Sequence, residues 1–246
     1  MVYQSNIDYE NSIFLTFDID WAHDDVIKDT IEILEVENVK ATIFITHDCA
    51  VLTELRSNKN FELGIHPNFN PSLNTETGSE SYQQVTGRMM QLVPEAISVR
   101  SHHLVSSSGL LNYYAFCGLK IDANQYITIN SGIICRPYII WNNILRVPHF
   151  WEDDLQLLEN KKGISDISNI HDYEGIKIFD FHPIHVYLNT DSMDRYETAR
   201  PHFRNINEIS KLRNNESYGI RNALYDLINE SKKRNYTFRT LDELLT

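Results

Sequence analysis

The chain alternates between short apolar runs typical of β-strands and amphipathic segments typical of helices, and this order limits its possible folds more than any other feature. Strand-like runs are expected at residues 13–19, 41–46, 61–65, 97–100, 118–123, 145–150, 176–181 and 236–239. Helices are expected at residues 24–36, 49–56, 80–92, 110–116 and 218–233. Because strands separated by helices pair in parallel, the sequence predicts an α/β fold, a closed or nearly closed (β/α) barrel of about seven parallel strands.

The composition fits one globular domain and argues against some classes of partner. A length of 246 residues suits a barrel of this kind, so residues 1–246 are expected to form a single domain. A hydrophobic content of 42% supports an ordinary core. The net charge of −12 argues against nucleic acid as a partner, because phosphate contacts need Lys and Arg.

Cysteine spacing and hydropathy indicate a cytoplasmic protein. Cys49, Cys117 and Cys135 are widely spaced and odd in number, so neither a disulfide framework nor a C-x-x-C metal site is expected. No basic segment followed by an apolar one opens the chain, and no apolar run approaches the ~18 residues of a transmembrane helix. The sequence therefore predicts a cytoplasmic location and no transmembrane segment.

Polar residues directly follow several strand-like runs, and the first such cluster holds two carboxylates. Asp18 and Asp20 lie at the end of the run at 13–19, and residues two apart in a strand point to the same side. Two like charges so close are unfavourable unless a cation lies between them or one carboxylate keeps its proton. The pair is therefore a candidate for metal-assisted acid–base chemistry.

The same arrangement recurs at later strand ends. The polar residues that follow other predicted strands are His66, Arg100, His102 and His182. In (β/α) barrels the functional side chains lie at the carboxyl ends of the strands. We therefore expect these residues to gather with Asp18 and Asp20 at one end of the barrel.

His66 and Asn70 are candidates for the metal ligands that accompany Asp20. They are four residues apart, a spacing that places two side chains on one face of a helical turn, and Pro67 can open such a turn. Imidazole nitrogen and carboxylate oxygen suit zinc or a similar divalent ion. Asn70 is a weak ligand, and the following Pro71 disfavours helical angles there. The alternative interpretation of this segment is a plain surface turn.

Arg100 and His182 are candidates for catalysis. A buried arginine beside a carboxylate keeps it ionised and oriented, as a general base such as Asp18 requires. An imidazole that titrates near neutral pH can protonate a leaving amine or alkoxide. His182 ends its strand and is favoured as the acid, while His185, beyond Pro183, is the alternative.

His102 and His103 are adjacent, so that only one of them faces the site if the chain there is extended.

The order of these clusters extends over most of the chain. The segments are TFDID at residues 16–20, ATIF at 41–44, GIH at 64–66, RSH at 100–102, VPHFWEDD at 147–154 and FH at 181–182. Together they resemble the polysaccharide deacetylase family (NodB homology, carbohydrate esterase family 4), and within it the WbmS-like branch. The resemblance spans residues 13–185, and residues 240–244 are similar to the usual C-terminal ending of the family.

The resemblance implies a distorted (β/α) barrel of the NodB-homology type that removes N- or O-acetyl groups from sugars with a divalent metal ion. The implied roles are general base for Asp18, orientation of that base for Arg100, general acid for His182, metal binding for Asp20, His66 and Asn70, and substrate-pocket or supporting roles for Trp151, Asp153 and His102. Three positions depart from the family pattern, and one of them is His102, which replaces the usual proline. The two aspartates are adjacent in most relatives, and the second histidine ligand of the family is Asn70 here, so His23, His102 or water is expected to complete the ligand set.

These observations predict a metal-dependent hydrolase, with zinc as the expected ion, that removes an N-acetyl group from a sugar in surface polysaccharide or O-antigen biosynthesis. The expected substrate is an acylated amino sugar on a nucleotide- or lipid-linked precursor. The alternative is a metal-free carbohydrate-binding pseudoenzyme of the same fold, which lost its metal through Asn70. A third option is a related hydrolase of a cyclic amide or a formyl group.

Overall fold

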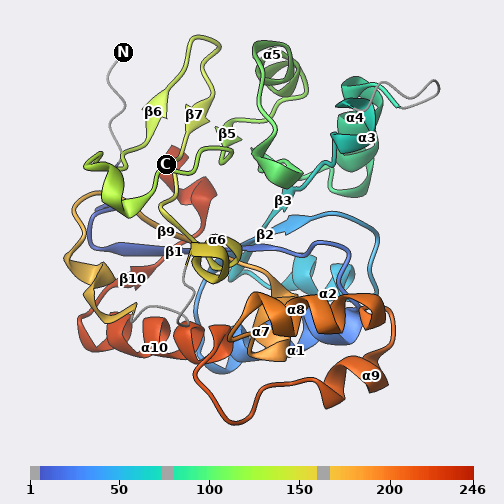
Figure 1. The fold of residues 1–246 in the computed structure, drawn as a ribbon. Coiled ribbons are helices and arrows are strands. Elements are labelled where there is room, and N and C mark those ends of the chain that lie inside the picture. Colours follow the sequence, from blue (N-terminus) through green and yellow to red (C-terminus); the bar gives the residue numbers. More distant parts are fainter. Residues whose placement is uncertain (1–5, 74–79, 160–166) are drawn as a thin grey trace.

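The computed structural model describes residues 6–73, 80–159 and 167–246 (Figure 1). The strands are β1 (Ser12–Asp18), β2 (Ala41–Ile45), β3 (Phe61–Ile65), β4 (Ser98–Val99), β5 (Ile121–Asp122), β6 (Tyr138–Ile139), β7 (Leu145–Arg146), β8 (Trp151–Glu152), β9 (Lys177–Phe181) and β10 (Thr237–Phe238). The α-helices are α1 (Asp24–Val36), α2 (Leu52–Ser57), α3 (Asn70–Leu73), α4 (Tyr82–Leu92), α5 (Ser108–Phe116), α6 (Asp153–Glu159), α7 (Pro183–Leu188), α8 (Met193–Ala199), α9 (Ile206–Lys211) and α10 (Ile220–Lys233). The 3₁₀-helices are η1 (His102–Leu104), η2 (Ile129–Ser131), η3 (Ile167–Asp172), η4 (Arg200–His202) and η5 (Leu241–Leu245).

The strands form one curled, mostly parallel sheet. Their order is β6-β7-β5-β4-β3-β2-β1-β9-β8, and β10 pairs with β1. Among the described strands only β6 and β7 pair antiparallel, as a hairpin that extends away from the helices α1 and α10 (Figure 1). A parallel bridge between Tyr126 and His149 joins the chain after β5 to the chain before β8, so the two sides of the sheet approach each other. The predicted distorted (β/α) barrel is confirmed, and each predicted strand-like run overlaps an observed strand.

The central strand β1 consists of residues that are all buried. It lies between β2 and β9 in the sheet, so it needs a nearly continuous apolar sequence instead of an alternating one. Its register places Phe17 opposite Phe181 of β9, and the two rings stack with their centroids 5.7 Å apart. The carboxyl ends of β1 and β9 are thereby fixed next to each other.

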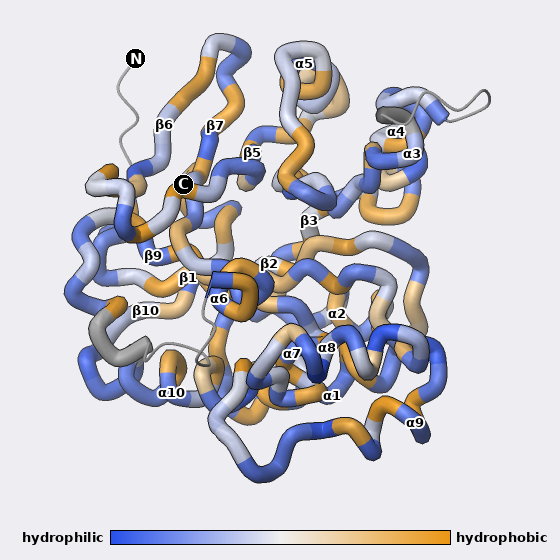
Figure 2. The backbone as a smooth tube through the Cα atoms, viewed as in Figure 1, coloured by the Kyte–Doolittle hydropathy of each residue, from blue (hydrophilic) through white to orange (hydrophobic). Residues whose placement is uncertain are grey.

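Helices α1, α7 and α10 pack together on one side of the sheet, with α7 in contact with both of the others (Figure 1). Helix α1 begins after His23, whose side chain accepts a hydrogen bond from the backbone N–H of Asp25. Along α10 hydrophobic and hydrophilic residues alternate at helical spacing, as Figure 2 shows, so one side of the helix is buried. Among the described helices, none is both long and apolar enough to cross a membrane.

Several short elements carry no signal in the sequence pattern. Strands β6 and β8 have only two residues each, too few for a periodicity, and they form because β7 and β9 offer free edges. The short helices between 183 and 211 were not predicted either, and they depend on packing more than on helix propensity.

The C-terminal segment is attached to the barrel through a buried carboxylate on β3. Glu62 Oε2 accepts hydrogen bonds from Thr42 Oγ1 at 2.7 Å and from the backbone N–H of Asp242 at 3.0 Å. Thr42 Oγ1 in turn accepts the N–H of Leu241 at 3.0 Å. Burial, and then the charge of Asp242, raises the pKa of Glu62 to about 7.

The raised pKa of Glu62 predicts a loss of stability with rising pH. Glu62 ionises near pH 4.5 in the unfolded chain but only near pH 7 in the folded one, so the unfolded state is favoured as the pH rises between these values. The difference corresponds to about 3 kcal/mol, which is present below about pH 4.5 and lost above about pH 7. Glu62→Gln should remove this dependence, because a neutral amide can keep the acceptor oxygen.

Urea unfolding at pH 5 and pH 8 measures this effect. The free energy of unfolding of Glu62→Gln should fall less between the two pH values than that of the wild type, by about 2–3 kcal/mol. Glu32→Gln, at an exposed position of α1, serves as the matched control and should behave like the wild type. Equal pH dependence in the wild type and Glu62→Gln would contradict the prediction.

Candidate metal centre

The candidate site lies where the carboxyl ends of neighbouring parallel strands meet. Asp18 is the last residue of β1, and the residues that directly follow β3, β4 and β9 are His66, Arg100 and His182. The backbone N–H groups of His66 and Arg100 continue the sheet, donating to Ile45 O at 2.8 Å and Ile65 O at 3.1 Å. Strand pairing therefore brings together residues that are far apart in the sequence, as the barrel prediction requires.

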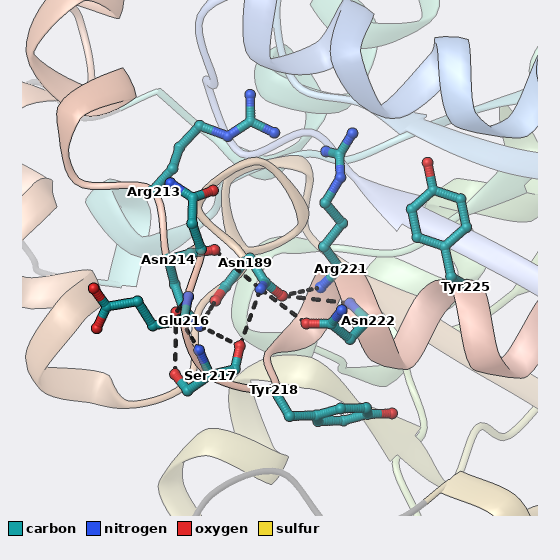
Figure 3. Close-up of a pocket in the computed structure, with 10 residues that line it drawn as sticks. Asn189, Arg213, Asn214, Glu216, Ser217, Tyr218, Arg221, Asn222 and Tyr225 are labelled. Atoms are coloured by element: carbon teal, nitrogen blue, oxygen red, sulfur yellow. Dashed lines mark hydrogen bonds between the residues drawn. The ribbon is translucent and has the colours of Figure 1, made fainter.

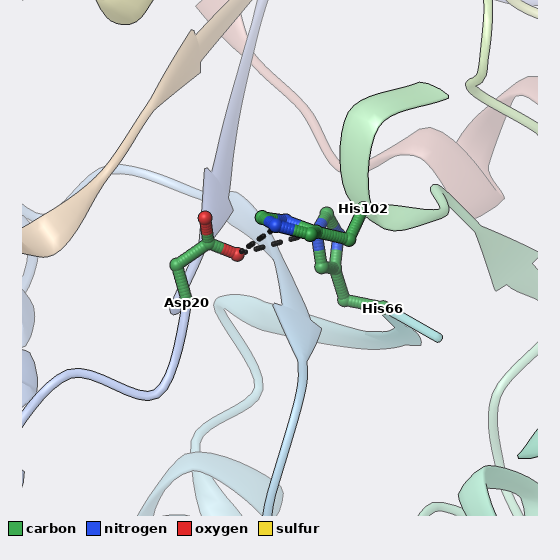
Figure 4. Close-up of side chains that lie close together, drawn as sticks. All are labelled: Asp20, His66 and His102. Atoms are coloured by element: carbon green, nitrogen blue, oxygen red, sulfur yellow. Dashed lines mark hydrogen bonds and ion pairs between the residues drawn. The ribbon is translucent and has the colours of Figure 1, made fainter. Parts of the chain in front are cut away.

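Three side-chain atoms at this end of the barrel form a nearly equilateral triangle (Figure 4). Asp20 Oδ1 lies 3.3 Å from His66 Nε2 and 3.4 Å from His102 Nδ1, and the two nitrogens are 3.4 Å apart. A tetrahedral site with metal–ligand bonds of about 2.0–2.1 Å has edges of about 3.4 Å. The donor triangle, as we name these three atoms, therefore fits a tetrahedral divalent ion with one position left for water or substrate.

The surroundings of Asp20 also fit a cation. Its Oδ1 atom is buried and makes no hydrogen bond of good geometry with any described residue. Burial by itself would raise the pKa of Asp20, but the contacts with His102 and His66 lower it well below its ordinary value. An ionised carboxylate between two imidazole nitrogens is a typical donor set for a divalent metal ion.

Asp20 reaches this position by a turn and not along a strand. We expected Asp18 and Asp20 to point to the same side of one strand, and this is wrong because β1 ends at Asp18. Asp20 and Trp21 adopt left-handed backbone angles, with φ of 35° and 53°. The turn brings the Asp20 carboxylate to His66 from one side, while Asp18 approaches the same ring from β1.

The expected helical turn from His66 to Asn70 is also wrong. Residues 67–69 are not helical, and α3 begins only at Asn70, because the proline at 71 can occupy the first turn of a helix but not continue one. The Asn70 amide nitrogen lies 2.9 Å from His103 Nδ1, so this side chain contacts the histidine beside the donor triangle. The structure thus places His102, not Asn70, in the third corner.

His23, the other histidine considered for the third ligand position, and His103, the neighbour of His102, have different roles. His23 caps α1 through its Nδ1 atom. The segment at His102 and His103 is not extended, since η1 contains His103 at a φ of 58°. The rings of His102 and His103 stack with their centroids 4.1 Å apart, so His103 packs against the His102 ring.

Arg100 is the buried side chain that fixes Asp18, which in turn contacts His66 of the donor triangle. Its side chain is completely buried, and Nη1 donates to Asp18 Oδ1 at 3.1 Å, to Asp180 Oδ1 at 2.5 Å and to Thr16 Oγ1 at 2.9 Å. Burial raises the pKa of Asp180 well above its ordinary value, although the charge of Arg100 opposes this shift. The predicted contact between Arg100 and Asp18 is therefore present.

The absence of a side chain at Gly64 makes room for the Phe44 ring, which contacts Arg100. The guanidinium carbon lies 4.7 Å from the centroid of the Phe44 ring, in the geometry of a cation–π contact. A Cβ atom at Gly64 would lie 2.6 Å from ring carbons of Phe44 and 2.6 Å from Ser98 Oγ. Any larger residue at Gly64 would displace the Phe44 ring on which Arg100 rests.

His182 is oriented by Asp153. Its Nδ1 atom lies 2.6 Å from Asp153 Oδ1, and its backbone N–H donates to Asp153 Oδ2 at 2.7 Å. Burial alone would lower the pKa of His182, but the charges of Asp154 and Asp153 raise it well above its ordinary value. The second ring nitrogen, Nε2, lies 3.7 Å from Asp20 Oδ2. The expected pairing of Asp153 with His182 is therefore in place, and it leaves Nε2 beside the donor triangle.

His185 belongs to a separate pair. Its Nε2 atom lies 2.5 Å from Asp154 Oδ1, and its Nδ1 atom lies 3.1 Å from Thr190 Oγ1. A distance of 2.5 Å between Nε2 and Oδ1 corresponds to a hydrogen bond. It is too short for two atoms that bind the same metal ion. Burial by itself would raise the pKa of Asp154, but the charge of His182 and the contact with His185 lower it below its ordinary value.

A cavity of about 220 Å³ opens beside the donor triangle. Its lining residues are Asp20, Trp21, Ala22, His102, Asp154, His182, Ile184, His185, Tyr196, Arg200 and Phe203. Trp151, which we expected in a sugar pocket, does not line it. The Trp151 indole is 3% exposed and packs on Phe181 with ring centroids 4.6 Å apart, because β8 places it in the core.

Sequence reasoning missed several residues of the site. Asp180 is a lone carboxylate within the apolar strand β9, and such a residue needs a buried partner, which is a signal that could have identified it. Trp21 is 45% exposed and its ring meets His102 edge-on, with the centroids 5.2 Å apart. The residues of α8 and η4 gave no signal, since only the fold brings them to the cavity.

A larger cavity, of about 540 Å³, lies between the end of α7 and the start of α10 (Figure 3). Asn189, Asn214 and Asn222 meet there, and their amide groups hydrogen-bond to one another or to backbone carbonyls. Arg213 and Arg221 both pair with Asp29 of α1. The polar groups of this cavity are thus largely used within the protein, and its lining residues include no histidine or cysteine. The smaller cavity is the candidate site.

Comparison with known proteins now assigns the family. The family model described as WbmS-like polysaccharide deacetylase matches residues 15–200. The chain belongs to this family. The family prediction from the sequence is therefore confirmed. A search of curated proteins found no match.

One solved structure supports the same assignment, and two others share the fold. A Bordetella bronchiseptica protein, described as a candidate polysaccharide deacetylase involved in O-antigen biosynthesis, is 41% identical, with 91% of this chain and 92% of that chain covered and a TM-score of 0.86. The Bc1960 peptidoglycan N-acetylglucosamine deacetylase is 15% identical, with 99% and 91% covered and a TM-score of 0.55. The 4-α-glucanotransferase of Thermococcus litoralis is 12% identical, with 95% and 37% covered and a TM-score of 0.51. The last two share the fold with this chain.

The donor triangle predicts which histidine holds the metal. His102→Ala should weaken Zn²⁺ binding at least about 100-fold, because it removes one of three protein donors. Asn70→Ala should change the affinity less than about threefold. Competition with a chromophoric chelator measures both constants, and thermal unfolding of the metal-free proteins checks that each variant folds. Loss of binding in Asn70→Ala together with unchanged binding in His102→Ala would contradict the assignment.

Proposed function

We propose that this protein is a metal-dependent deacetylase that hydrolyses the N-acetyl group of an amino sugar. The observation that carries the proposal is that a base candidate and an acid candidate each contact a residue of the donor triangle through an atom that is not one of its corners. Asp18 Oδ2 lies 3.4 Å from His66 Nδ1, and His182 Nε2 lies 3.7 Å from Asp20 Oδ2. Amide hydrolysis needs a base for the attacking water and an acid for the leaving nitrogen, close to one electrophilic centre.

The donor triangle would hold a divalent ion, and zinc is the ion we propose. When bound, such an ion supplies a Lewis acid that polarises the acyl carbonyl and lowers the pKa of water. Tetrahedral donor spacing with two imidazole nitrogens and one carboxylate oxygen favours zinc over ions that prefer octahedral oxygen ligands.

The residues of the chain supply proton transfer. Asp18, oriented by its hydrogen bond from Arg100, accepts the proton of the attacking water. His182 donates a proton from Nε2 to the departing nitrogen. Asp153 fixes the tautomer and the direction of the His182 ring through its contact with Nδ1, as the carboxylate of a catalytic triad does.

The cavity and the family support a sugar as the substrate. Three aromatic side chains, Trp21, Tyr196 and Phe203, line a space of about 220 Å³ in which they can pack against the apolar faces of a sugar ring. The Bordetella relative is described as involved in O-antigen biosynthesis. We therefore propose an N-acetylated sugar of a surface polysaccharide, carried on a nucleotide or a lipid and deacetylated in the cytoplasm.

The metal-free pseudoenzyme is less well supported. That alternative depended on Asn70 as the replacement for a histidine ligand. His102 offers an imidazole nitrogen within 3.4 Å of both other donors, so the chain retains three ligands despite Asn70. We therefore propose catalysis and not binding alone.

Acetate release from nucleotide-linked N-acetyl amino sugars tests the function directly. The zinc-loaded wild type should release acetate and not formate, and removal of zinc with a chelator should abolish the release. Asp18→Asn should lower turnover roughly 10²–10⁴-fold, because it removes the general base. Its zinc content should stay within about twofold of the wild type. If Asp18→Asn keeps full turnover, Asp18 is not the base, and if it loses zinc, Asp18 acts through His66.

A second set of variants separates the two histidines at the start of α7. His182→Gln should lower turnover roughly 10²–10⁴-fold, because the leaving nitrogen loses its acid. Asp153→Asn should cause a similar loss, since the amide favours the wrong tautomer of His182. His185→Gln should retain much more activity than either. Greater loss in His185→Gln than in His182→Gln would assign the acid to His185. Steady-state kinetics of acetate release provide the comparison.

A further inference from the structure

We propose that Asp154 binds the amino group released by the reaction, and that it thereby selects N-acylated sugars over O-acylated ones. This inference rests on the proposed deacetylase function. It concerns one carboxylate of the cavity wall whose charge acts on His182, but which neither belongs to the donor triangle nor transfers a proton in the proposed reaction.

The Asp154 carboxylate is fixed at one oxygen and open at the other. Its Oδ1 atom is held by His185 Nε2 at 2.5 Å, and His185 is itself held by Thr190 at 3.1 Å. Its Oδ2 atom lies 4.0 Å from His182 Nε2. The side chain is 39% exposed and lines the cavity. A group placed at His182 Nε2 therefore also lies within reach of a firmly positioned negative charge.

The other acidic side chains and the arginine near the cavity already contact residues of the protein or belong to the donor triangle. Among the lining residues the carboxylates are Asp20 and Asp154, and Asp20 belongs to the donor triangle. Asp153, behind His182, is fully buried and uses both of its oxygens on that residue. Arg200 forms an ion pair with Glu197, with contacts of 3.0 and 3.1 Å. Asp154 is thus the carboxylate available to a positively charged ligand in this cavity.

The chemistry of the reaction produces such a charge beside His182. Hydrolysis of an amide breaks the C–N bond, forms a C–O bond to the oxygen of water and leaves a carboxylate. The nitrogen takes one proton from His182 and leaves as an amine. At neutral pH the carboxylic acid product loses its O–H proton and the amine gains one, so the products are a carboxylate and an ammonium. The proton that Asp18 took from water restores His182. An ester gives a neutral alcohol instead. A carboxylate beside the leaving atom therefore favours the positive charge that develops on the amide nitrogen, and contributes nothing comparable for an ester.

Binding of glucosamine and glucose tests the proposal without turnover, because the two sugars differ in the ammonium group. The full-length chain with one equivalent of Zn²⁺ is titrated with each sugar at pH 6.5, and the dissociation constants are measured by NMR. The wild type should bind glucosamine at least about tenfold more tightly than glucose. Asp154→Asn should reduce this preference to less than about threefold, and Asp154→Glu should keep most of it.

Asp172→Asn is the matched control, because it makes the same change at an exposed ion pair with Arg234. It should retain the preference of the wild type. An unchanged preference in Asp154→Asn, or no preference in the wild type, would overturn the proposal. Failure of the deacetylase function would be seen separately, as the absence of acetate release from N-acetylated sugars.

Discussion

The buried positive charge of Arg100 is the interaction on which the rest of the site depends. A guanidinium removed from water is stable only when carboxylates and hydrogen-bond acceptors surround it. Here the acceptors come from the strands β1 and β9, which lie side by side in the sheet. The strand register that pairs Thr16 with Asp180 also places Asp18 over the guanidinium. Because breaking a buried ion pair costs about 3–5 kcal/mol, the position of Asp18 is coupled to the integrity of the barrel.

His66 connects this buried network to the open cavity. Its Nδ1 atom faces Asp18 and its Nε2 atom faces Asp20, so one ring lies between the proposed base and the donor triangle. A carboxylate on the second nitrogen of a ligand histidine fixes the ring and raises its basicity. The base and the metal site therefore share a residue, His66. For this reason zinc content and turnover have to be measured together.

The surroundings of His182, the proposed acid, come from residues that are adjacent in the sequence, unlike those of Asp18. Asp153 and Asp154 are adjacent at the start of α6, and each contacts a different histidine of the segment that opens α7. Asp153 is buried and orients His182, whereas Asp154 is partly exposed and lines the cavity. Two carboxylates with the same chemistry thus have different tasks, because one is removed from the solvent and the other is not. This difference is the basis of the selectivity that we propose for amide substrates.

The sequence by itself determined the order of strands and helices, since short apolar runs such as that of β1 alternate with amphipathic segments along the chain. It also determined that Asp18, His66, Arg100 and His182 lie together, because each follows a strand and all parallel strands end on the same side. Only the tertiary structure decided that His102 forms the third corner of the donor triangle, since left-handed turns at Asp20 and next to His102 set the final approach of these side chains. Such turns depend on the packing around them, and the spacing of residues in the sequence does not predict that packing.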